Sequence, residues 1–413
     1  MKAITFLGTT DYKTTIYAFG DHTFETRFFA EALPSFFPDL NRIFVFVTPT
    51  VQQHDNLTQL KRCLGPLLQP VPIPEGHSEA ELWQIFDALT ATVAEHDEVL
   101  FDITHSFRSI PLLVFLAAAY MRAVRGVDVK GVIYGAWEAR DQETNVSPVF
   151  DLTPFVTLLD WLTAAERFTQ TGDGCSLATL LRERVPPGLT MGEDLQARNL
   201  GNGLKQAATA IEAISLALRV TRPIETMEAT AHLDVALQRA QPAIAAHVRP
   251  FALLTDQVRS AYTPFALSNP LDRAKWPDNL RIQLALVHWY LEKGQIVQAA
   301  TLAREWVVSF AALRLGADSL VNLEGVRFPI EGALNNACRR RAGKSIDRPS
   351  HYDDPLAALP EINTLVAAWN RLGDLRNDIA HVGMNENPKK VARLCQDMTR
   401  IYPLLETLGK AIL

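Results

Sequence analysis

The stretch EVLFDITHSFRSIPLLVFLAAAYMRAVRG, residues 98–126, decides the fold of the N-terminal half of the chain. Its first seven residues, 98–104, form a short apolar run typical of a strand buried on both faces of a parallel sheet. Residues 109–126 are mostly apolar over the length of a helix and end at Gly126, which favours a helix C-terminus there. A strand followed at once by a helix is the unit from which α/β domains are built.

The same alternation continues through residues 1–155. Strand-like runs occur at 3–8, 42–49 and 129–137, and a helix is expected to begin at Ser78, where Glu81 completes a capping-box pattern. The sequence therefore predicts an α/β, Rossmann-like N-terminal domain with a mostly parallel sheet.

Helical spacing replaces the strand signals from about residue 156. We expect a helical connector over residues 156–200 and an all-α C-terminal domain over residues 201–413. Two domains also agree with the length, because 413 residues exceed what one ordinary core accommodates.

Composition narrows the class of protein. The chain is 48% hydrophobic and 21% charged, as in globular proteins, and its net charge of -6 argues against a nonspecific nucleic-acid coat protein. Four scattered cysteines form no CxxC pair, so neither a zinc site nor a disulfide framework is predicted. Without a signal-peptide pattern or an apolar run of about 18 residues, a cytoplasmic protein with no membrane span is expected.

Polar side chains follow three of the predicted strands, at residues 8–12, 102–108 and 134–138. Ligands of open parallel sheets bind beyond the carboxyl ends of the strands, so the three segments that follow these strands should meet in one site. Neither GxGxxG nor GxxxxGK[ST] is present, which argues against a dinucleotide cofactor and a P-loop. The candidate ligand-binding residues are Gly8, Thr9, Thr10, Asp11, Tyr12, Asp102, Thr104, His105, Ser106, Arg108, Tyr134 and Gly135.

Hydroxyls and backbone N–H groups at a helix start can hold phosphate or ribose oxygens, and Arg108 can add a bidentate phosphate contact. A structural alternative is equally open: Asp102 and Thr104 cap the turn into the next helix, and His105 packs in the interior. A small-molecule α/β enzyme using Asp102 and His105 is a further alternative.

A second candidate site lies in LGDLRNDIAHVG, residues 372–383, where Arg376 and His381 are expected inside a helix. RNA is cut by its own 2′-hydroxyl if a base removes that proton and an acid protonates the leaving oxygen, and an imidazole can do either. Arginine can hold the phosphate while charge builds, with Asn377 supporting the phosphate or orienting the histidine. Five residues on a regular helix turn through roughly 140°, so a two-helix seam or a local distortion is required.

Both segments resemble known families. DITHSFRS is similar to the D-x-T-H-G/S signature of CRISPR-associated proteins with a CARF domain, a Rossmann-like sensor of cyclic oligoadenylate, with Ser106 where many relatives have glycine. LGTTDY and YGAWE resemble further motifs of that family. The R-x4-H pair resembles the R-x4–6-H motif of HEPN ribonucleases, whose two protomers combine their motif residues in one site.

The resemblance implies a metal-independent endoribonuclease that cuts single-stranded RNA in CRISPR antiviral defence. It implies no cofactor and no metal; the activator would be a cyclic oligoadenylate, with cyclic tetra-adenylate as the expected ring, bound by a homodimer or higher homo-oligomer. The alternative from another class is a nucleotide-responsive regulator or scaffold without nuclease activity. Whether the sensor also degrades its own ligand is left open.

Overall fold

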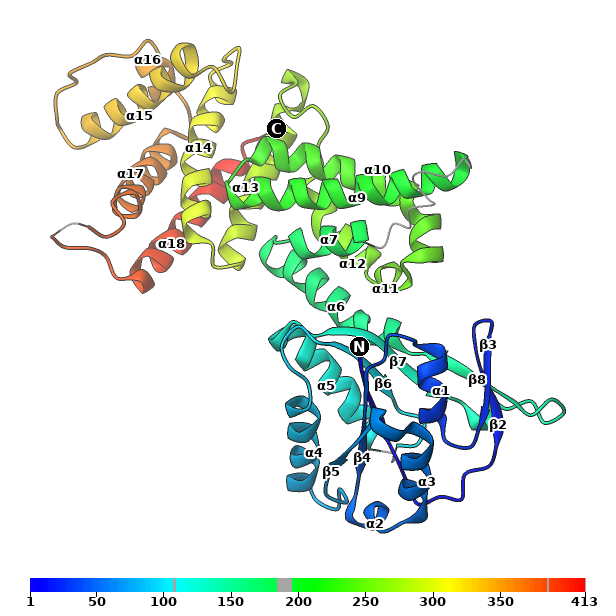
Figure 1. The fold of residues 1–413 in the computed structure, drawn as a ribbon. Coiled ribbons are helices and arrows are strands. Elements are labelled where there is room, and N and C mark those ends of the chain that lie inside the picture. Colours follow the sequence, from blue (N-terminus) through cyan, green and yellow to red (C-terminus); the bar gives the residue numbers. More distant parts are fainter. Residues whose placement is uncertain (107–108, 184–194, 385, 413) are drawn as a thin grey trace. The chain divides into compact units, whose positions relative to one another are not determined.

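A computed structural model describes residues 1–106, 109–183, 195–384 and 386–412, which leaves the candidate Arg108 outside the described residues. The chain separates into two compact units, Met1–Asp160 (unit 1) and Trp161–Leu413 (unit 2) (Figure 1). Unit 1 contains strands and helices, and the described part of unit 2 is helical, so the predicted fold class is confirmed.

Unit 1 is built on an eight-stranded sheet with the order β3-β2-β8-β7-β6-β1-β4-β5. The pairs β1–β4, β1–β6, β4–β5, β6–β7 and β2–β8 are parallel, whereas β7–β8 and β2–β3 are antiparallel. The strands are β1 Lys2–Phe6, β2 Thr15–Phe19, β3 His22–Thr26, β4 Arg42–Val47, β5 Leu68–Pro72, β6 Glu98–Asp102, β7 Asp128–Gly135 and β8 Val146–Asp151.

Helices cover both faces of this sheet, which explains why its central strands read as continuous apolar runs. In β4, Ile43, Val45 and Val47 face one layer of helices, and Phe44 and Phe46 face the other. The first layer contains α1 and α3, and the second contains α4 and α5 (Figure 1). The helices of unit 1 are α1 Phe29–Phe36, α2 Pro49–Gln52, α3 Asp55–Leu64, α4 Glu79–Ala91 and α5 Ile110–Arg125, with 3-10 turns at Gly65–Leu67 and Trp137–Ala139.

The four predicted strands correspond to β1, β4, β6 and β7. The strands β2, β3, β5 and β8 were not predicted, because their sequences lack long apolar runs and two of them contain proline. β3 and β5 are the edges of the sheet, where half-exposed side chains and proline are tolerated.

The predicted helix start at Ser78 is present, with a modified cap. The Ser78 hydroxyl accepts a hydrogen bond from the Glu81 backbone N–H at 3.2 Å. The Glu81 carboxylate, however, accepts from the backbone N–H groups of Gly76 and His77, at 2.8 and 2.9 Å, rather than from Ser78. Glu81 therefore fixes the loop that enters α4 as well as the helix start.

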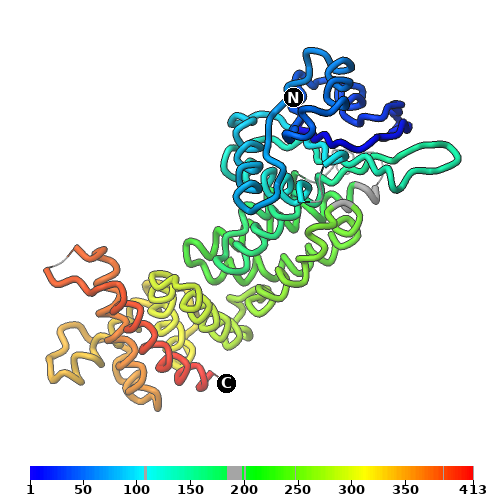
Figure 2. The backbone as a smooth tube through the Cα atoms, turned by 90° about the horizontal axis from the view of Figure 1, so that it is seen from below, coloured from blue at the N-terminus to red at the C-terminus, as the bar shows by residue number. Residues whose placement is uncertain are grey.

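Unit 2 is packed around a single apolar core, to which Trp161, Phe168 and Leu177 of the predicted connector also belong. Its helices are α6 Thr153–Thr171, which begins in unit 1, α7 Cys175–Glu183, α9 Leu195–Arg219, α10 Pro223–His247, α11 Arg249–Ala252, α12 Thr255–Tyr262, α13 Trp276–Glu292, α14 Ile296–Arg314, α15 Phe328–Arg341, α16 Asp353–Ala357, α17 Ile362–Ala380 and α18 Val391–Gly409. Short 3-10 turns lie at Thr263–Phe265 and Arg273–Lys275, and a π-helical turn at Leu323–Arg327. Figure 2 shows α17 and α18 side by side.

Among the described residues, α14 is the one helix that is long and apolar enough to cross a membrane. In the structure, 61% of its apolar window is buried inside the protein. Trp306, Val307 and Phe310 are fully buried in the core of unit 2, which is the position of a core helix.

The cap at Ser78 can be tested against a serine that occupies the same position without capping. Ser78→Ala should lower the free energy of unfolding by about 1 kcal/mol, because the Glu81 N–H loses its partner. Ser109→Ala at the start of α5 should change it by a few tenths at most, since that side chain makes no cap hydrogen bond. Urea unfolding monitored by circular dichroism measures both, and equal losses would contradict the assigned cap.

Candidate functional site

The strand order reverses at β1, which lies between β6 on one side and β4 on the other. Such a switch point opens a crevice at the carboxyl ends of the strands. The loops that leave β1, β6 and β7 meet there and enclose a cavity of about 230 Å³. The cavity is lined by Thr10, Asp11, Tyr12, Lys13, Tyr17, Arg27, Thr104, His105, Tyr134, Gly135, Trp137 and Glu138. Seven of the predicted ligand-binding residues are therefore brought together.

Asp102, the last residue of β6, lies behind this cavity and ties its loops together. Its fully buried carboxylate accepts hydrogen bonds from the Thr5 hydroxyl of β1 at 2.6 Å and from the Thr104 backbone N–H at 2.8 Å. The Thr104 hydroxyl in turn accepts from the Gly135 backbone N–H at 2.8 Å. The Asp102 carboxylate thus links β1, the loop after β6 and the end of β7. Asp102 also caps the turn that follows β6, which was the structural role considered for it in the sequence analysis.

Burial raises the pKa of Asp102 to about 6, from an ordinary value of 3.8, although the hydrogen bonds from Thr104 and Thr5 favour the ionised form. Desolvation outweighs the hydrogen bonds because a fully buried carboxylate loses its contact with water.

His105 lines the cavity beside Tyr12. The two rings lie 3.9 Å apart between centroids, and His105 Nε2 accepts a hydrogen bond from the Phe29 backbone N–H at 3.2 Å. Since Nε2 accepts, the neutral ring carries its proton on Nδ1. Burial lowers the pKa of His105 to about 4, so the imidazole offers a ligand no charge at neutral pH.

The loop after β1 is held by its own side chains. The Tyr12 hydroxyl accepts from the Gly8 backbone N–H at 2.9 Å, and burial raises the Tyr12 pKa. The Asn56 amide donates to the carbonyl oxygens of Gly8 and Thr10, both at 3.0 Å. With its backbone fixed in this way, the loop presents the exposed side chains of Thr9 and Thr10 to solvent.

The remaining candidates differ in accessibility. The Ser106 hydroxyl donates to the Ile103 carbonyl at 2.8 Å and closes its own turn, outside the cavity lining. The Tyr134 hydroxyl donates to Glu138 at 2.6 Å, and burial together with this carboxylate raises the Tyr134 pKa to about 12. Gly135 is packed so closely that a Cβ atom there would lie 2.7 Å from Tyr17 and 2.9 Å from Phe29.

The cavity also contains two cations that the sequence analysis missed. Lys13 forms an exposed ion pair with Asp11 at 2.6 Å. The Arg27 guanidinium lies 4.5 Å from the centroid of the Phe28 ring and has no carboxylate partner among the described residues. Lys13 directly follows the LGTTDY motif, residues 7–12. Arg27 lies in the connection between β3 and α1, where no sequence pattern predicts a binding residue.

In unit 2 the predicted Arg376 and Asn377 lie on the last turns of α17, but the expectation that His381 is inside the helix is wrong. The helix ends at Ala380, and His381 is its C-cap residue, with its backbone N–H donating to the Asn377 carbonyl at 3.1 Å. All three side chains are exposed, and none has a hydrogen-bond or ion-pair partner among the described residues. The helix stops because Val382 and Gly383 both have positive φ, 55° and 70°.

The segment that follows His381 is anchored back to α17. The Asp378 carboxylate accepts a hydrogen bond from the Lys389 backbone N–H at 3.1 Å, which closes the turn beside the candidate pair. Positive φ at the β-branched Val382 is unfavourable, and strained backbone of this kind is frequent at functional sites.

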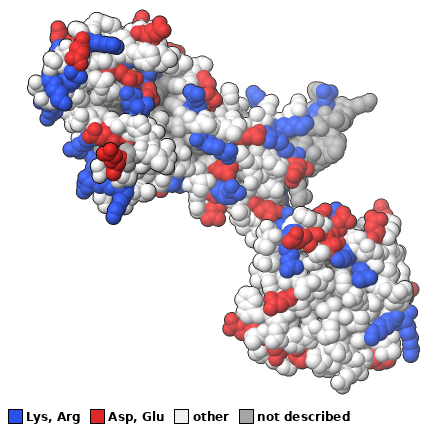
Figure 3. All heavy atoms as spheres, turned by 60° about the vertical axis from the view of Figure 1, so that its left-hand side comes forward, with Lys and Arg blue, Asp and Glu red and all other residues white. Residues whose placement is uncertain are grey.

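Basic side chains are exposed on the two helices that this turn connects. Arg371, Lys390, Arg393 and Arg400 are exposed on α17, on α18 or next to them. Figure 3 shows Lys and Arg side chains gathered with some carboxylates at the end of unit 2 that carries α15 to α18. Within the described residues, no group of three or more His, Cys, Asp or Glu side chains is placed to hold a metal ion.

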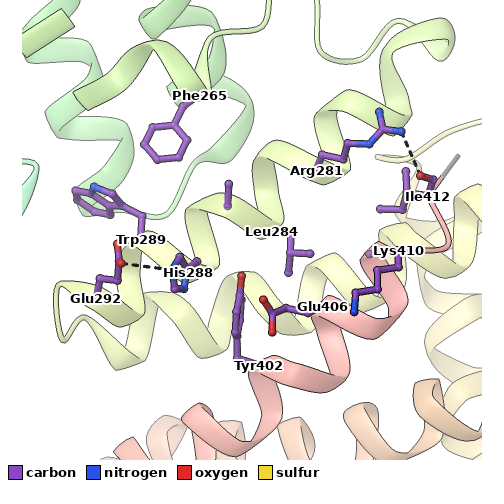
Figure 4. A pocket seen from close by; sticks show the side chains of 12 residues that line it. Phe265, Arg281, Leu284, His288, Trp289, Glu292, Tyr402, Glu406, Lys410 and Ile412 are labelled. Carbon is purple, nitrogen blue, oxygen red and sulfur yellow. Dashed lines mark hydrogen bonds and ion pairs between the residues drawn. The ribbon is translucent and has the colours of Figure 1, made fainter. Parts of the chain in front are cut away.

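Unit 2 contains a cavity of about 530 Å³, which lies between α13 and α18 (Figure 4). His288 stacks on Tyr402 with ring centroids 5.1 Å apart and lies 3.4 Å from the Glu292 carboxylate. Neither Arg376 nor His381 lines this groove.

Comparison with known proteins gives a local sequence match and a weak structural likeness, among others. No protein-family model matches the chain. Over 112 residues it is 36% identical to the CRISPR-associated protein MJ1674 of Methanocaldococcus jannaschii, a segment that spans 26% of this chain and 18% of that protein. The structure of Enterococcus italicus Csm6 bound to cyclic hexa-2′-fluoro-hexa-dAMP aligns with a TM-score of 0.45 and 11% identity, over 100% of this chain and 94% of that one. The sequence match confirms the resemblance to CRISPR-associated proteins for that segment.

The buried carboxylate of Asp102 makes a prediction about pH. Because its folded-state pKa is raised, the folded protein binds this proton more tightly than the unfolded chain does, and stability is lost as pH rises from about 4 to 6. Relative to Asp102→Asn, the wild-type protein should lose about 2 kcal/mol of unfolding free energy between pH 4 and pH 7. Denaturant titrations of both proteins across this range measure the difference. Parallel curves would show that Asp102 is ionised throughout.

Proposed function

We propose that this protein is an endoribonuclease that cuts single-stranded RNA and is activated when a cyclic oligoadenylate binds in the cavity of unit 1. The observation that carries the proposal is the pair Arg376 and His381 at the end of α17, exposed and without side-chain partners among the residues that the structure describes. A guanidinium and an imidazole held in this way are free to contact a substrate, and the exposed basic side chains of α17 and α18 attract a polyanion.

The chemistry needs only what the chain and the RNA supply. A base takes the proton of a 2′-hydroxyl, the oxygen attacks the adjacent phosphorus, and the bond to the 5′-oxygen breaks as an acid protonates that oxygen. The product has a 2′,3′-cyclic phosphate and no co-reactant is consumed. His381 serves as base or acid, Arg376 stabilises the charge on the phosphate, and Asn377 orients either group.

The cavity of unit 1 offers the groups that a nucleotide ring requires. Arg27 and Lys13 are cations for phosphates, Thr10 is a hydroxyl for ribose or phosphate oxygens, and Tyr12 and Trp137 are aromatic faces for bases. At about 230 Å³ the cavity is smaller than the roughly 300–1,000 Å³ of a typical ligand pocket, so one copy holds part of a ring. Two copies related by a two-fold axis would supply matching halves.

Two exposed apolar surfaces support such a homodimer. In unit 1, Leu112, Leu116, Tyr120 and Val124 follow one another at four-residue spacing on α5, and all are between 42% and 64% exposed. In unit 2, the exposed Val382, Met384 and Val391 flank the candidate catalytic turn. Apolar patches of this kind mark interaction sites, and a second copy would bring two His381 side chains, one base and one acid, to one site.

Activation then requires that the ring binds one arrangement of the dimer more tightly than another, because a ligand shifts an equilibrium only through differential affinity. The 112-residue match to a CRISPR-associated protein supports a role in CRISPR antiviral defence. Incubation of labelled RNA with the protein and a panel of cyclic oligoadenylates tests the whole proposal. RNA binding without cutting under every condition would favour a ligand-responsive binding module instead.

The catalytic pair is tested by His381→Ala, which should abolish RNA cleavage while leaving the binding of cyclic oligoadenylate unchanged. Arg376→Lys should restore little activity relative to Arg376→Ala, because lysine lacks the planar fork. His351→Ala, which removes another exposed histidine of unit 2, is the matched control and should cut at the wild-type rate. Cleavage by His381→Ala within a few-fold of wild type would refute the assignment.

The sensor is tested by Arg27→Ala, which should raise the activator concentration needed for half-maximal cleavage by about 10- to 100-fold, since a charge-assisted contact is lost. Arg42→Ala is the control, because Arg42 begins β4 at the opposite end of the strands and bonds to Gln69. Activation curves and calorimetry measure both variants. Identical curves for the two variants would mean that the ring does not bind in this cavity.

A further inference from the structure

We propose that unit 2 contains a second small-molecule site, which binds an uncharged nucleobase, with adenine as the expected base. The site is a cavity of about 430 Å³ between the start of α10, α13, α14 and the π-helical turn Leu323–Arg327. This volume is within the range of ligand pockets. None of the residues proposed for RNA cleavage lines it, so it stands independently of the proposed function.

Buried polar side chains line this cavity, which distinguishes it from a packing defect. Asn279, Gln283, Ser309 and Arg327 are each at least nine-tenths buried and all contribute to its wall. Burying polar groups costs free energy unless they are hydrogen-bonded, so a cavity formed by packing alone would be apolar. A polar wall therefore indicates a ligand that can form hydrogen bonds.

Gln283 is the group that is left for a ligand. Its amide nitrogen donates one hydrogen bond, at 2.6 Å, to the Asn279 side chain, which is itself fixed by donating to the Pro270 carbonyl at 2.7 Å. The second amide hydrogen and the carbonyl oxygen of Gln283 have no partner among the described residues. Gln283 is only 5% exposed, yet it presents an adjacent donor and acceptor to the cavity.

An adjacent donor and acceptor on one planar amide match the edge of a nucleobase. Glutamine recognises adenine in this way, accepting from N6 and donating to N7. Aliphatic side chains form the rest of the wall and suit the faces of a flat ring: Ile224, Leu271, Leu302, Leu320, Val321 and Leu323.

The charges around the cavity favour an uncharged ligand. The guanidinium of Arg327 is occupied, since it donates to the Ser309 hydroxyl at 3.0 Å, to the Leu320 carbonyl at 2.7 Å and to the Glu305 carboxylate at 2.6 Å. The other charged lining residues, Arg222 and Glu225, are exposed and of opposite sign. With two cations balanced by two anions, the wall offers no net charge to a phosphate.

The backbone is unusual in two of the segments that line the cavity. Thr221, a β-branched residue, has φ of 57°, and the segment ending at Arg327 is a π-helical turn. Both conformations are disfavoured, and both occur preferentially at functional sites. The π turn brings Arg327 to Ser309 of α14, and Thr221 belongs to another segment that lines the cavity.

Calorimetry on the full-length protein tests the site, with adenosine as the probe and uridine for comparison. Adenosine should bind to the wild-type protein. The Gln283→Met substitution keeps the shape of the side chain but removes its amide, so it should lower the affinity for adenosine by about 10- to 100-fold. Gln241→Met is the matched control, because Gln241 lines a different pocket of unit 2, and should leave the affinity unchanged.

Since Gln283→Met also removes the partner of Asn279, a second variant tests the site without touching the buried network. Val321→Trp at the half-exposed rim should fill the cavity and block adenosine while the melting temperature stays near wild type. A deoxyadenylate pentamer shows whether the natural ligand is a base within a nucleic-acid strand or a free nucleoside. Tighter binding than adenosine indicates a base within a strand, and weaker binding indicates a free nucleoside. Absence of adenosine and pentamer binding to wild type, or unchanged binding in both variants, would overturn the proposal.

Discussion

The arrangement of unit 1 depends on one buried carboxylate at the point where the strand order reverses. Asp102 holds the Thr5 hydroxyl of the neighbouring strand and the backbone of Thr104, and Thr104 in turn holds Gly135. The loops leaving β6 and β7 are therefore linked to β1 through a few short hydrogen bonds. Because a buried carboxylate is costly unless it is hydrogen-bonded, the same interactions that position the cavity also make its geometry sensitive to substitution.

Unit 2 uses polar groups in two opposite ways. Arg376 and His381 are exposed at a helix end and have no side-chain partner within the described part of the chain, so they are available to a substrate or to a second copy. Asn279, Gln283 and Arg327, by contrast, are buried beside a cavity, where Asn279 and Arg327 are held by hydrogen bonds and Gln283 makes one. The exposed pair suits chemistry on a large polyanion, whereas the buried set suits selection of a small neutral molecule.

In a single copy, the proposed site of each unit is incomplete, and a homodimer would complete it. One cavity of unit 1 is small for a cyclic nucleotide, and one Arg376–His381 pair supplies a single imidazole where strand cleavage needs a base and an acid. Exposed apolar side chains lie on α5 in one unit and around Val382 in the other. In the proposed homodimer, a second copy would supply the matching half of each site, and binding at one site would bias the other only through differential affinity.

The sequence by itself determined the fold class, the four central strands and the loops in which the candidate ligand-binding residues lie. Apolar runs indicate strands that are buried on both faces of a sheet, and capping residues such as Ser78 and Gly126 indicate where helices begin and end. Only the tertiary structure decided the rest. Arg27 reaches the cavity through an unpredicted hairpin, and Asp102 faces Thr5 across a separation of 97 residues. His381 lies outside its helix because Val382 and Gly383 reverse the backbone, and Gln283 lines a cavity formed by distant segments. These features arise from contacts between segments far apart in the chain, which local periodicity does not encode.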